Sequence, residues 1–151
     1  MKKIKLYDTT LRDGLGMEGI SLSLKDKIEI VKKLDSLGID FIEGGFPGSN
    51  PKDAAFFDSV QEIKLKNAKM VAFGSTRKAN SEPSKDESLK ALLDAKTDYL
   101  TIVGKSSLSQ VNEVLQTTDE ENIAMIKDSI EYLSSKKRKI IFDAEHFFDG
   151  Y

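Results

Sequence analysis

Short apolar runs alternate with longer amphipathic stretches along this sequence, and this alternation limits the possible folds more than any other feature. Apolar runs of strand length occupy residues 4–7, 41–43, 70–73, 99–103 and 140–142. Between them lie stretches with apolar residues at helical spacing. A βαβαβαβαβ order requires a parallel sheet with right-handed crossovers, because a helix returns the chain to the same end of the sheet each time. Either a doubly wound sheet or part of a (β/α)8 barrel satisfies this order.

Four helices are expected because residues that cap helix N-termini stand before the amphipathic stretches. The side-chain oxygen of such a residue accepts a hydrogen bond from an otherwise unpaired backbone N–H in the first turn, and proline favours that turn. Each cap precedes apolar residues spaced three or four apart. The predicted start signals are Ser23 with Asp26, Asn50 with Pro51, Ser84 with Glu87, and Thr118 with Glu121.

The chain of 151 residues is long enough for one domain but too short for a whole barrel. A complete (β/α)8 barrel takes about 250 residues, so this length accommodates about five strands and four helices of one. The last predicted strand lies close to the end of the sequence, and no stretch has the composition of a linker. We therefore expect residues 1–151 to share one hydrophobic core.

Charge and composition exclude several functional classes. Basic (23) and acidic (25) residues nearly balance, with a formal net charge of −2, so no strong field favours nucleic acid or an acidic membrane surface. The basic run SSKKRK at residues 134–139 is expected at the C-terminal end of a helix, where cations interact favourably with the helix dipole. No apolar run approaches the ~18 residues of a membrane span. The absence of cysteine excludes disulfides and thiolate metal sites, and these features together predict a cytoplasmic protein.

Charged side chains follow several of the predicted strands. The carboxyl ends of parallel strands share one edge in both candidate folds, so these side chains are expected to converge. Five carboxylates gathered there would repel one another unless a cation or an arginine compensated their charge. The sequence therefore predicts a divalent metal site with Arg12 beside it. The acidic residues are Asp8 and Asp13 after the first strand, Glu43 at the end of the second, and Asp143 and Glu145 after the fifth.

Structural roles are an alternative for some polar residues and glycines near these strands. Asp8 has the position of a residue that ends a strand and bonds the backbone of the following turn. Gly44, Gly45 and Gly48 have neither P-loop nor dinucleotide-binding spacing, so turn formation is favoured over phosphate binding. His146 is the only histidine, and a hydrogen-bonded loop residue is favoured over a metal ligand or a base.

Three motifs resemble one enzyme family. They are YDTTLRDG at residues 7–14, followed by Lys27, IDFIEGGFPGSNPKD at residues 39–53, and FDAEHFFDGY at residues 142–151. The first resembles a signature of the DRE-TIM metallolyases that make α-isopropylmalate, homocitrate and citramalate. The other two are more similar to the citramalate synthase branch. The resemblance runs from residue 4 to residue 151 and implies a TIM (β/α)8 barrel, of which residues 1–151 would be the N-terminal portion.

The resemblance also implies roles for individual residues. Asp13 would be a metal ligand, and Arg12 would bind the substrate and polarise the carbonyl of a 2-keto acid. Glu43 and Glu145 match active-site glutamates and are expected to be catalytic. Asp143 lies near the expected mouth of the barrel and is expected to contact the substrate.

The implied reaction is a metal-assisted condensation of acetyl-CoA with a 2-keto acid such as pyruvate. A divalent metal (Mg²⁺, Mn²⁺ or Zn²⁺) would hold the carbonyl and carboxylate of the keto acid and act as a Lewis acid. Loss of a methyl proton from acetyl-CoA would create the nucleophile, and hydrolysis of the thioester would release CoA. The corresponding expectations for partners are these small molecules and a homo-oligomer, with no nucleic acid and no membrane.

This sequence departs from the family pattern at two points. Gly16 stands where the family has a glutamine, and the His-x-His pair that supplies the other metal ligands is absent. A single carboxylate does not provide enough ligands for a metal site. We therefore expect the isolated 151 residues to be inactive and to bind no metal or bind it incompletely. Two alternatives to the synthase are an acyl-CoA lyase or aldolase of the same superfamily, and a non-catalytic truncated barrel that associates with itself through its open edges.

Overall fold

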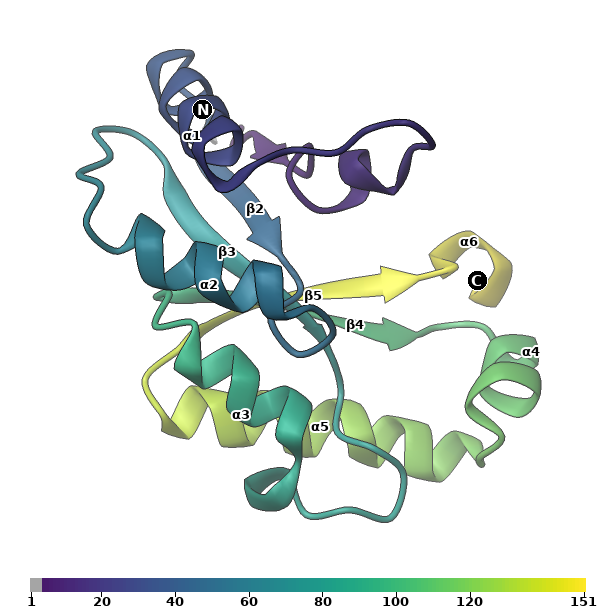
Figure 1. The fold of residues 1–151 in the computed structure, drawn as a ribbon. Helices are drawn as coiled ribbons and strands as arrows, with labels where there is room; N and C mark the ends of the chain where they lie inside the picture. The colour runs from purple at the N-terminus through teal and green to yellow at the C-terminus, as the bar shows by residue number, and fades with distance from the viewer. Residues whose placement is uncertain (1–3) are drawn as a thin grey trace.

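A computed structural model describes residues 4–151 of the chain. Its centre is a five-stranded sheet in which the strands follow chain order and every neighbouring pair is parallel. The sheet is curved, with the long helices on its outer side (Figure 1). This is the partial (β/α)8 barrel expected from the motifs, because a doubly wound sheet would reverse its strand order and carry helices on both faces. The strands are β1 Tyr7–Asp8, β2 Phe41–Gly45, β3 Lys69–Ser75, β4 Tyr99–Lys105 and β5 Lys139–Glu145.

Helices connect the strands, and the four that the sequence predicts are present. They are α1 Leu24–Ser36, α2 Pro51–Val60, α3 Glu87–Asp94 and α5 Asp119–Ser135. Shorter helical segments lie in the loops that follow the strands and are too short to be predicted from periodicity. These segments are η1 Asp13–Gly16, η2 Pro83–Lys85, α4 Leu108–Gln110, the single π-helical turn η3 Val111–Leu115, and α6 Phe147–Gly150.

Three of the four predicted helix caps are confirmed. At α1, for example, Ser23 and Asp26 form a reciprocal capping box, with the Asp26 backbone N–H 3.2 Å from the Ser23 hydroxyl. The capping box predicted for Ser84 is wrong, because Ser84 lies in η2 and α3 begins three residues later, at Glu87. Asp86 caps α3 instead, and its carboxylate accepts a hydrogen bond from the Leu89 backbone N–H at 3.0 Å.

The first strand is shorter than predicted and begins later. Only Tyr7 and Asp8 pair with β2, whereas the expected strand covered residues 4–7. Ile4 and Leu6 are exposed, so the apolar character of this segment does not reflect burial in the described structure. The other four strands contain the predicted residues and extend further, because their backbones pair with strands on one or both sides.

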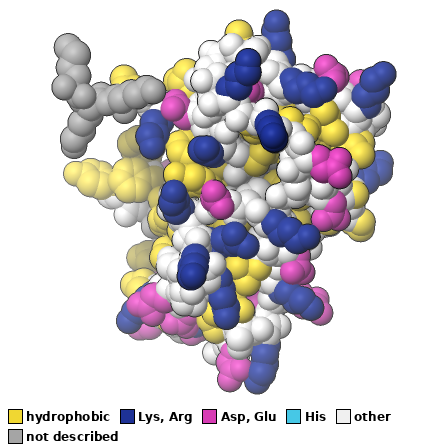
Figure 2. Space-filling view, turned by 90° about the vertical axis from the view of Figure 1, so that its left-hand side faces the viewer, with side chains coloured by type: hydrophobic (Ala, Val, Ile, Leu, Met, Phe, Trp, Pro, Cys, Tyr) yellow, Lys and Arg dark blue, Asp and Glu magenta, His cyan; other side chains and the backbone are white. Residues whose placement is uncertain are grey.

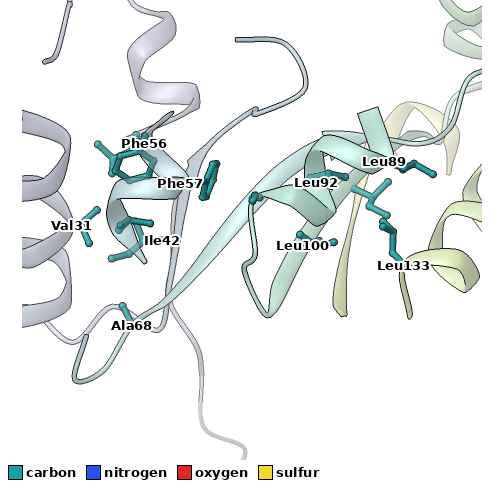
Figure 3. Close-up of a cluster of buried hydrophobic side chains, with 14 residues drawn as sticks. Val31, Ile42, Phe56, Phe57, Ala68, Leu89, Leu92, Leu100 and Leu133 are labelled. Atoms are coloured by element: carbon teal, nitrogen blue, oxygen red, sulfur yellow. The ribbon is translucent and has the colours of Figure 1, made fainter. Parts of the chain in front are cut away.

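The hydrophobic core fills the space between the sheet and the helices (Figure 3). Ile42 of β2 and Leu100 of β4 are fully buried, as are Phe56 of α2 and Leu92 of α3. Full burial of one such side chain stabilises the fold by roughly 1.5–3 kcal/mol. These residues hold the strands rigidly, and the rigid sheet determines where side chains on its other face lie.

Side chains on the concave face of the sheet form the site. Successive residues of a strand point to opposite faces, so the neighbours of core residues point away from the helices. Glu43 follows Ile42, and Thr101 follows Leu100. The concave face therefore receives polar side chains from several strands.

The outer surface carries charges of both signs. Figure 2 shows basic and acidic side chains interspersed over the face that lies on the left of Figure 1, as expected for a chain with a net charge of −2. The basic run at residues 134–139 begins within the last turn of α5 and continues past its end at Ser135, the predicted position. Within residues 4–151, none of the helices combines the length and apolar character needed to cross a membrane.

Candidate active site

A hollow of about 260 Å³ opens between the concave face and the loop that follows β1. Three of the five residues predicted to form the site, Arg12, Glu43 and Asp143, line this one hollow. They come from the loop after β1, from β2 and from β5, so the curvature of the sheet brings together residues far apart in the sequence. The complete lining is Tyr7, Thr9, Arg12, Glu43, Thr101, Ile141, Phe142 and Asp143.

A tight turn after β1 places Arg12 at the hollow. The carbonyl oxygen of Thr9 accepts hydrogen bonds from the backbone N–H groups of Arg12, at 3.1 Å, and Gly14, at 3.2 Å. Leu11, between them, is 1% exposed and anchors the turn in the core. With Leu11 pointing inward, the next side chain, Arg12, is directed along the concave face.

The guanidinium group of Arg12 is held on two sides. Its Nε–H donates to Oε1 of Glu43 at 2.5 Å, and its central carbon lies 3.9 Å from the centre of the Phe73 ring. Phe73 in turn makes an edge-on contact with Phe46, with ring centres 5.6 Å apart. Glu43 engages only the Nε–H of the five guanidinium donors, so the terminal nitrogens can present N–H groups to a carbonyl or carboxylate in the hollow.

Glu43 is buried, with 1% of its surface exposed, and it accepts hydrogen bonds from two side chains. Arg12 binds Oε1, and the Tyr7 hydroxyl donates to Oε2 at 2.5 Å. The Thr101 hydroxyl lies 2.6 Å from that of Tyr7. Burial, and secondly the hydrogen bond to Glu43, raise the pKa of Tyr7 well above its usual value of 10.0, so Tyr7 stays a neutral donor. Each carboxylate oxygen of Glu43 thus accepts a hydrogen bond from one side chain.

Asp13 lies outside the hollow. It is the first residue of η1, and 74% of its side chain is exposed. Its carboxylate is 3.5 Å from Nη1 of Arg12, a long contact. Residues 4–151 contain no group of three acidic or histidine side chains that could hold a metal ion. The metal centre predicted from converging carboxylates therefore does not form from these residues alone, because the strands separate the carboxylates instead of gathering them.

Glu145 lies in a neighbouring hollow of about 160 Å³ that also includes Lys105, Ser75 and Thr76. It forms an ion pair with Lys105, whose side chain is 17% exposed compared with 40% for Glu145. The parallel register pairs these two residues at the ends of β4 and β5. Lys105 therefore compensates the charge of a carboxylate at this edge, in addition to the predicted Arg12. The sequence did not single out this lysine.

Four residues of the site were missed in the sequence: Tyr7, Phe73, Thr101 and Lys105. Each lies on a predicted strand or within two residues of its end, and Thr101 and Lys105 have the same parity along β4. Alternation along a strand places such residues on one face, but it does not tell which face is concave. That choice depends on how the helices pack.

The structural alternatives hold for Asp8 and His146. The Asp8 carboxylate accepts hydrogen bonds from the backbone N–H, at 3.0 Å, and the hydroxyl, at 3.1 Å, of Thr10. Gly45 has a φ of +151°, and a Cβ atom there would lie 2.5 Å from the Asp53 carboxyl carbon. Nδ1 of His146 lies 2.9 Å from the Asp149 carboxylate in the α6 loop. Local hydrogen bonding therefore explains Asp8 and His146, whereas Gly45 lies at the end of β2, where the register with β3 shifts, and not in the turn that the sequence predicted.

Comparison with known proteins gives a family match and several similar proteins. It matches the HMGL-like family over residues 3–150. It is 54% identical over 151 residues to an (R)-citramalate synthase of Geobacter sulfurreducens, covering 100% of this chain and 29% of that protein. It is 35% identical over 144 residues to a probable 2-isopropylmalate synthase of Archaeoglobus fulgidus, covering 95% of this chain and 27% of that protein.

Solved structures agree on the fold. A hydroxymethylglutaryl-CoA lyase from Pseudomonas aeruginosa superimposes with a TM-score of 0.71 over 93% of this chain and 45% of the lyase chain, at 19% sequence identity. At this identity the likeness establishes the fold alone. The chain spans less than a third of the length of the two curated relatives, so their complete activities are not transferred by alignment.

Proposed function

The chain belongs to the HMGL-like family, and from this premise we propose that it forms one side of the active site of a synthase that condenses acetyl-CoA with a 2-keto acid. The motifs predicted this family, and that prediction is confirmed. The identity with a citramalate synthase, 54%, exceeds the 35% with an isopropylmalate synthase. This difference favours pyruvate, or a keto acid of similar size, as the substrate.

The observation that carries the proposal is the position of Arg12 at the hollow. Glu43 and Phe73 hold its guanidinium, while the terminal N–H groups can reach an oxygen in the hollow. Attack on the carbonyl carbon of a keto acid converts the carbonyl oxygen to an alkoxide. A fixed guanidinium next to that oxygen stabilises the charge as it develops, with little reorganisation during the reaction.

The two carboxylates of β5 have different proposed roles. Asp143 lines the same hollow as Arg12 and would contact the keto acid, helping to select its side chain. Glu145 lies in the neighbouring hollow, where it forms an ion pair with Lys105. Its side chain is 40% exposed, so a second substrate can reach it, and it would accept the methyl proton of acetyl-CoA.

Glu43 is proposed to orient Arg12 instead of exchanging a proton with the substrate. Both of its oxygens are engaged by donors, and only 1% of its surface is exposed. The motif implied a catalytic role for Glu43, and we restrict this role to the orientation of Arg12.

A divalent metal is proposed for the complete site, but residues 4–151 fit it only in part. Asp13 would supply one carboxylate ligand from its exposed position on η1. Further ligands have to come from outside the described residues, since no suitable group of three is present among them. The isolated 151 residues are accordingly proposed to be inactive.

A chimera tests the proposed function directly. The chain would replace the aligned segment of the Geobacter sulfurreducens (R)-citramalate synthase, to which it is 54% identical over 151 residues. With acetyl-CoA and pyruvate, and Mg²⁺ or Mn²⁺, the chimera should release CoA and form citramalate. Arg12→Met should lower kcat by about 10²–10³, the usual effect of removing one electrostatic donor from the transition state.

The control for the chimera is Arg138→Met, which removes a guanidinium far from the hollow, beyond the end of α5. This variant should retain the activity. A folded chimera without CoA release above background would contradict the synthase proposal. Cleavage of a 3-hydroxyacyl-CoA in place of condensation would support the lyase alternative, for which the solved structures provide only a shared fold.

Self-association is a second proposal, favoured by the open edge of β5. Among the described residues, β5 pairs only with β4, and Phe142 is 40% exposed. Open strand edges associate readily with other strands. Sedimentation velocity of the 151-residue chain should therefore show oligomers that increase with concentration, and a monomer at every concentration would contradict this proposal.

A further inference from the structure

We propose that Tyr7 is a positioning residue for this reaction: through Glu43, it fixes the direction in which Arg12 meets the substrate. The catalytic importance of this contact rests on the proposed function, whereas its structural test does not require activity. It concerns a chain of hydrogen bonds that crosses the concave face from Thr101 on β4 to Tyr7 on β1, and then to Glu43 on β2.

The direction of each hydrogen bond in this chain is determined by counting protons. An ionised carboxylate only accepts, so the single hydroxyl proton of Tyr7 goes to Oε2 of Glu43. The Tyr7 oxygen is then free only as an acceptor, and the Thr101 hydroxyl must donate to it across 2.6 Å. The order is therefore Thr101 to Tyr7 to Glu43, with Arg12 donating to the other oxygen of the same carboxylate.

This chain determines the rotation of the Glu43 carboxylate. A carboxylate held by one donor can turn about its terminal bond, which is a broad torsion. Tyr7 and Arg12 bind different oxygens, at 2.5 Å each, so the carboxylate plane is defined by both contacts. Without the Tyr7 hydroxyl, Oε2 would be a buried acceptor without that partner, and the carboxylate would reorient and loosen Arg12.

Tyr7 is a positioning residue because its proton is already engaged. The hydroxyl serves Glu43 and Thr101, and burial and the neighbouring carboxylate raise its pKa, so it does not release a proton near neutral pH. Tyr7 also lines the hollow. Phenylalanine would keep the ring and remove only the hydrogen bonds, which makes Tyr7→Phe a clean test.

The test measures hydrogen exchange at the arginine Nε–H groups by ¹⁵N NMR of the 151-residue chain. The sequence has only three arginines, Arg12, Arg77 and Arg138, so three signals are expected. Tyr7→Phe should accelerate exchange at Arg12 by about tenfold or more, the effect of losing one buried hydrogen bond to a charged group. Arg77, whose Nε–H donates to Asp128 at 3.0 Å, is an internal reference and should not change.

Matched variants separate positioning from general destabilisation. Tyr99→Phe removes a hydroxyl that accepts a hydrogen bond from the Lys139 amine at 3.5 Å, and it should leave Arg12 exchange unchanged. Thr101→Val should accelerate Arg12 exchange, whereas Thr101→Ser retains the hydroxyl and should restore slow exchange. Unchanged Arg12 exchange in both Tyr7→Phe and Thr101→Val, with Arg77 still protected, would overturn the proposal.

The chimera assay keeps this inference separate from the proposed function. Faster Arg12 exchange in Tyr7→Phe together with an inactive wild-type chimera would support the positioning of Arg12 by Tyr7 and overturn the synthase function. In an active chimera, Tyr7→Phe should lower kcat by about tenfold with a smaller change in KM, because orientation matters most in the transition state. An unchanged kcat would overturn the link between Tyr7 and the reaction.

Discussion

The guanidinium carbon of Arg12 lies 3.9 Å from the centre of the Phe73 ring, and the two groups come from different elements, the β1 loop and β3. The ring supports the face of the guanidinium while Glu43 holds its Nε edge. These two contacts restrict different motions of the same group. The guanidinium of Arg12 is therefore held in one orientation by these contacts, and under the proposed function this would lower the cost of orienting it in the transition state.

Replacing Phe73 with leucine should weaken catalysis more than folding. The cation–π contact is worth about 1–2 kcal/mol at a partly desolvated site, so kcat/KM of the chimera should fall by about five- to thirtyfold. Phe57→Leu is the matched control, because Phe57 is buried in the core. It should lower the midpoint of urea unfolding but leave kcat/KM of the folded enzyme unchanged. Equal losses of activity in both variants would argue against a specific role for Phe73.

Tyr7 should make the fold less stable at alkaline pH. Its pKa is raised in the folded chain, by burial first and then by Glu43, compared with 10.0 in an unfolded chain. Above pH 10 the unfolded chain loses this proton while the folded chain keeps it, so the free energy of unfolding decreases by about 1.4 kcal/mol per pH unit for this group. Urea titrations between pH 9 and about 11 measure the effect.

The Tyr7→Phe variant isolates this contribution from the ionisation of other tyrosines and of lysines. Its unfolding free energy should decrease less steeply with pH than that of the wild type above pH 10. Parallel pH dependences for the two proteins would show that the Tyr7 hydroxyl is not in the environment described here.

Alanine at Gly45 should destabilise the chain strongly. Gly45 has a φ of +151°, and an added Cβ would lie 2.5 Å from the Asp53 carboxyl group. Displacement of Asp53 would break its 2.9 Å ion pair with Lys27, which is 6% exposed. The combined strain and loss of a buried ion pair should cost about 2–4 kcal/mol, measured by urea unfolding.

Gly16 provides the matched control for Gly45. An added Cβ at Gly16 meets nothing within 4 Å, so Gly16→Ala should change the unfolding free energy by no more than about 0.5 kcal/mol. Gly16→Gln, which introduces the residue expected from the family, should be tolerated equally well. A large loss of stability in either variant would contradict the open environment of this position.

Asp35 should contribute stability that is lost in acid. Burial alone would raise its pKa, but backbone N–H groups of Ala68, Lys66 and Asn67 donate to the carboxylate and lower the pKa below 3.8. A lowered pKa stabilises the fold above pH 3.8, and this contribution disappears as the pH falls through the folded-state value. Asp35→Asn should therefore cost about 1.5–3 kcal/mol at pH 6 and less at pH 3.

The control for Asp35 is Asp58→Asn, an exposed carboxylate on the outer side of α2. Its effect should be small at both pH values. If the difference between wild type and Asp35→Asn were the same at pH 6 and pH 3, the hydrogen bonds to the ionised carboxylate would not be its source.

Local patterns in the sequence predicted the fold class and the family. Helix caps, apolar spacing and short strand-forming runs act over a few residues, so they can be recognised without knowing what packs against them. The capping error at Ser84 arose where two candidates stood two residues apart, and the carboxylate of Asp86 could serve both α3 and the backbone of Lys78. The residues at the carboxyl ends of the strands were identified because parallel topology alone places those ends together.

Tertiary structure alone decided which of these polar residues lie in the hollow with Arg12, which lie in the neighbouring hollow and which are exposed. The partners of Tyr7 are 36 and 94 positions away, so no local pattern could predict its bonds to Glu43 and Thr101. The curvature and register of the sheet directed Arg12 into the hollow, paired Glu145 with Lys105 and left Asp13 exposed. The sequence by itself thus determined which chemical groups reach the edge of the barrel. Their mutual distances follow from packing between strands, because that packing is a property of contacts between segments remote in the chain.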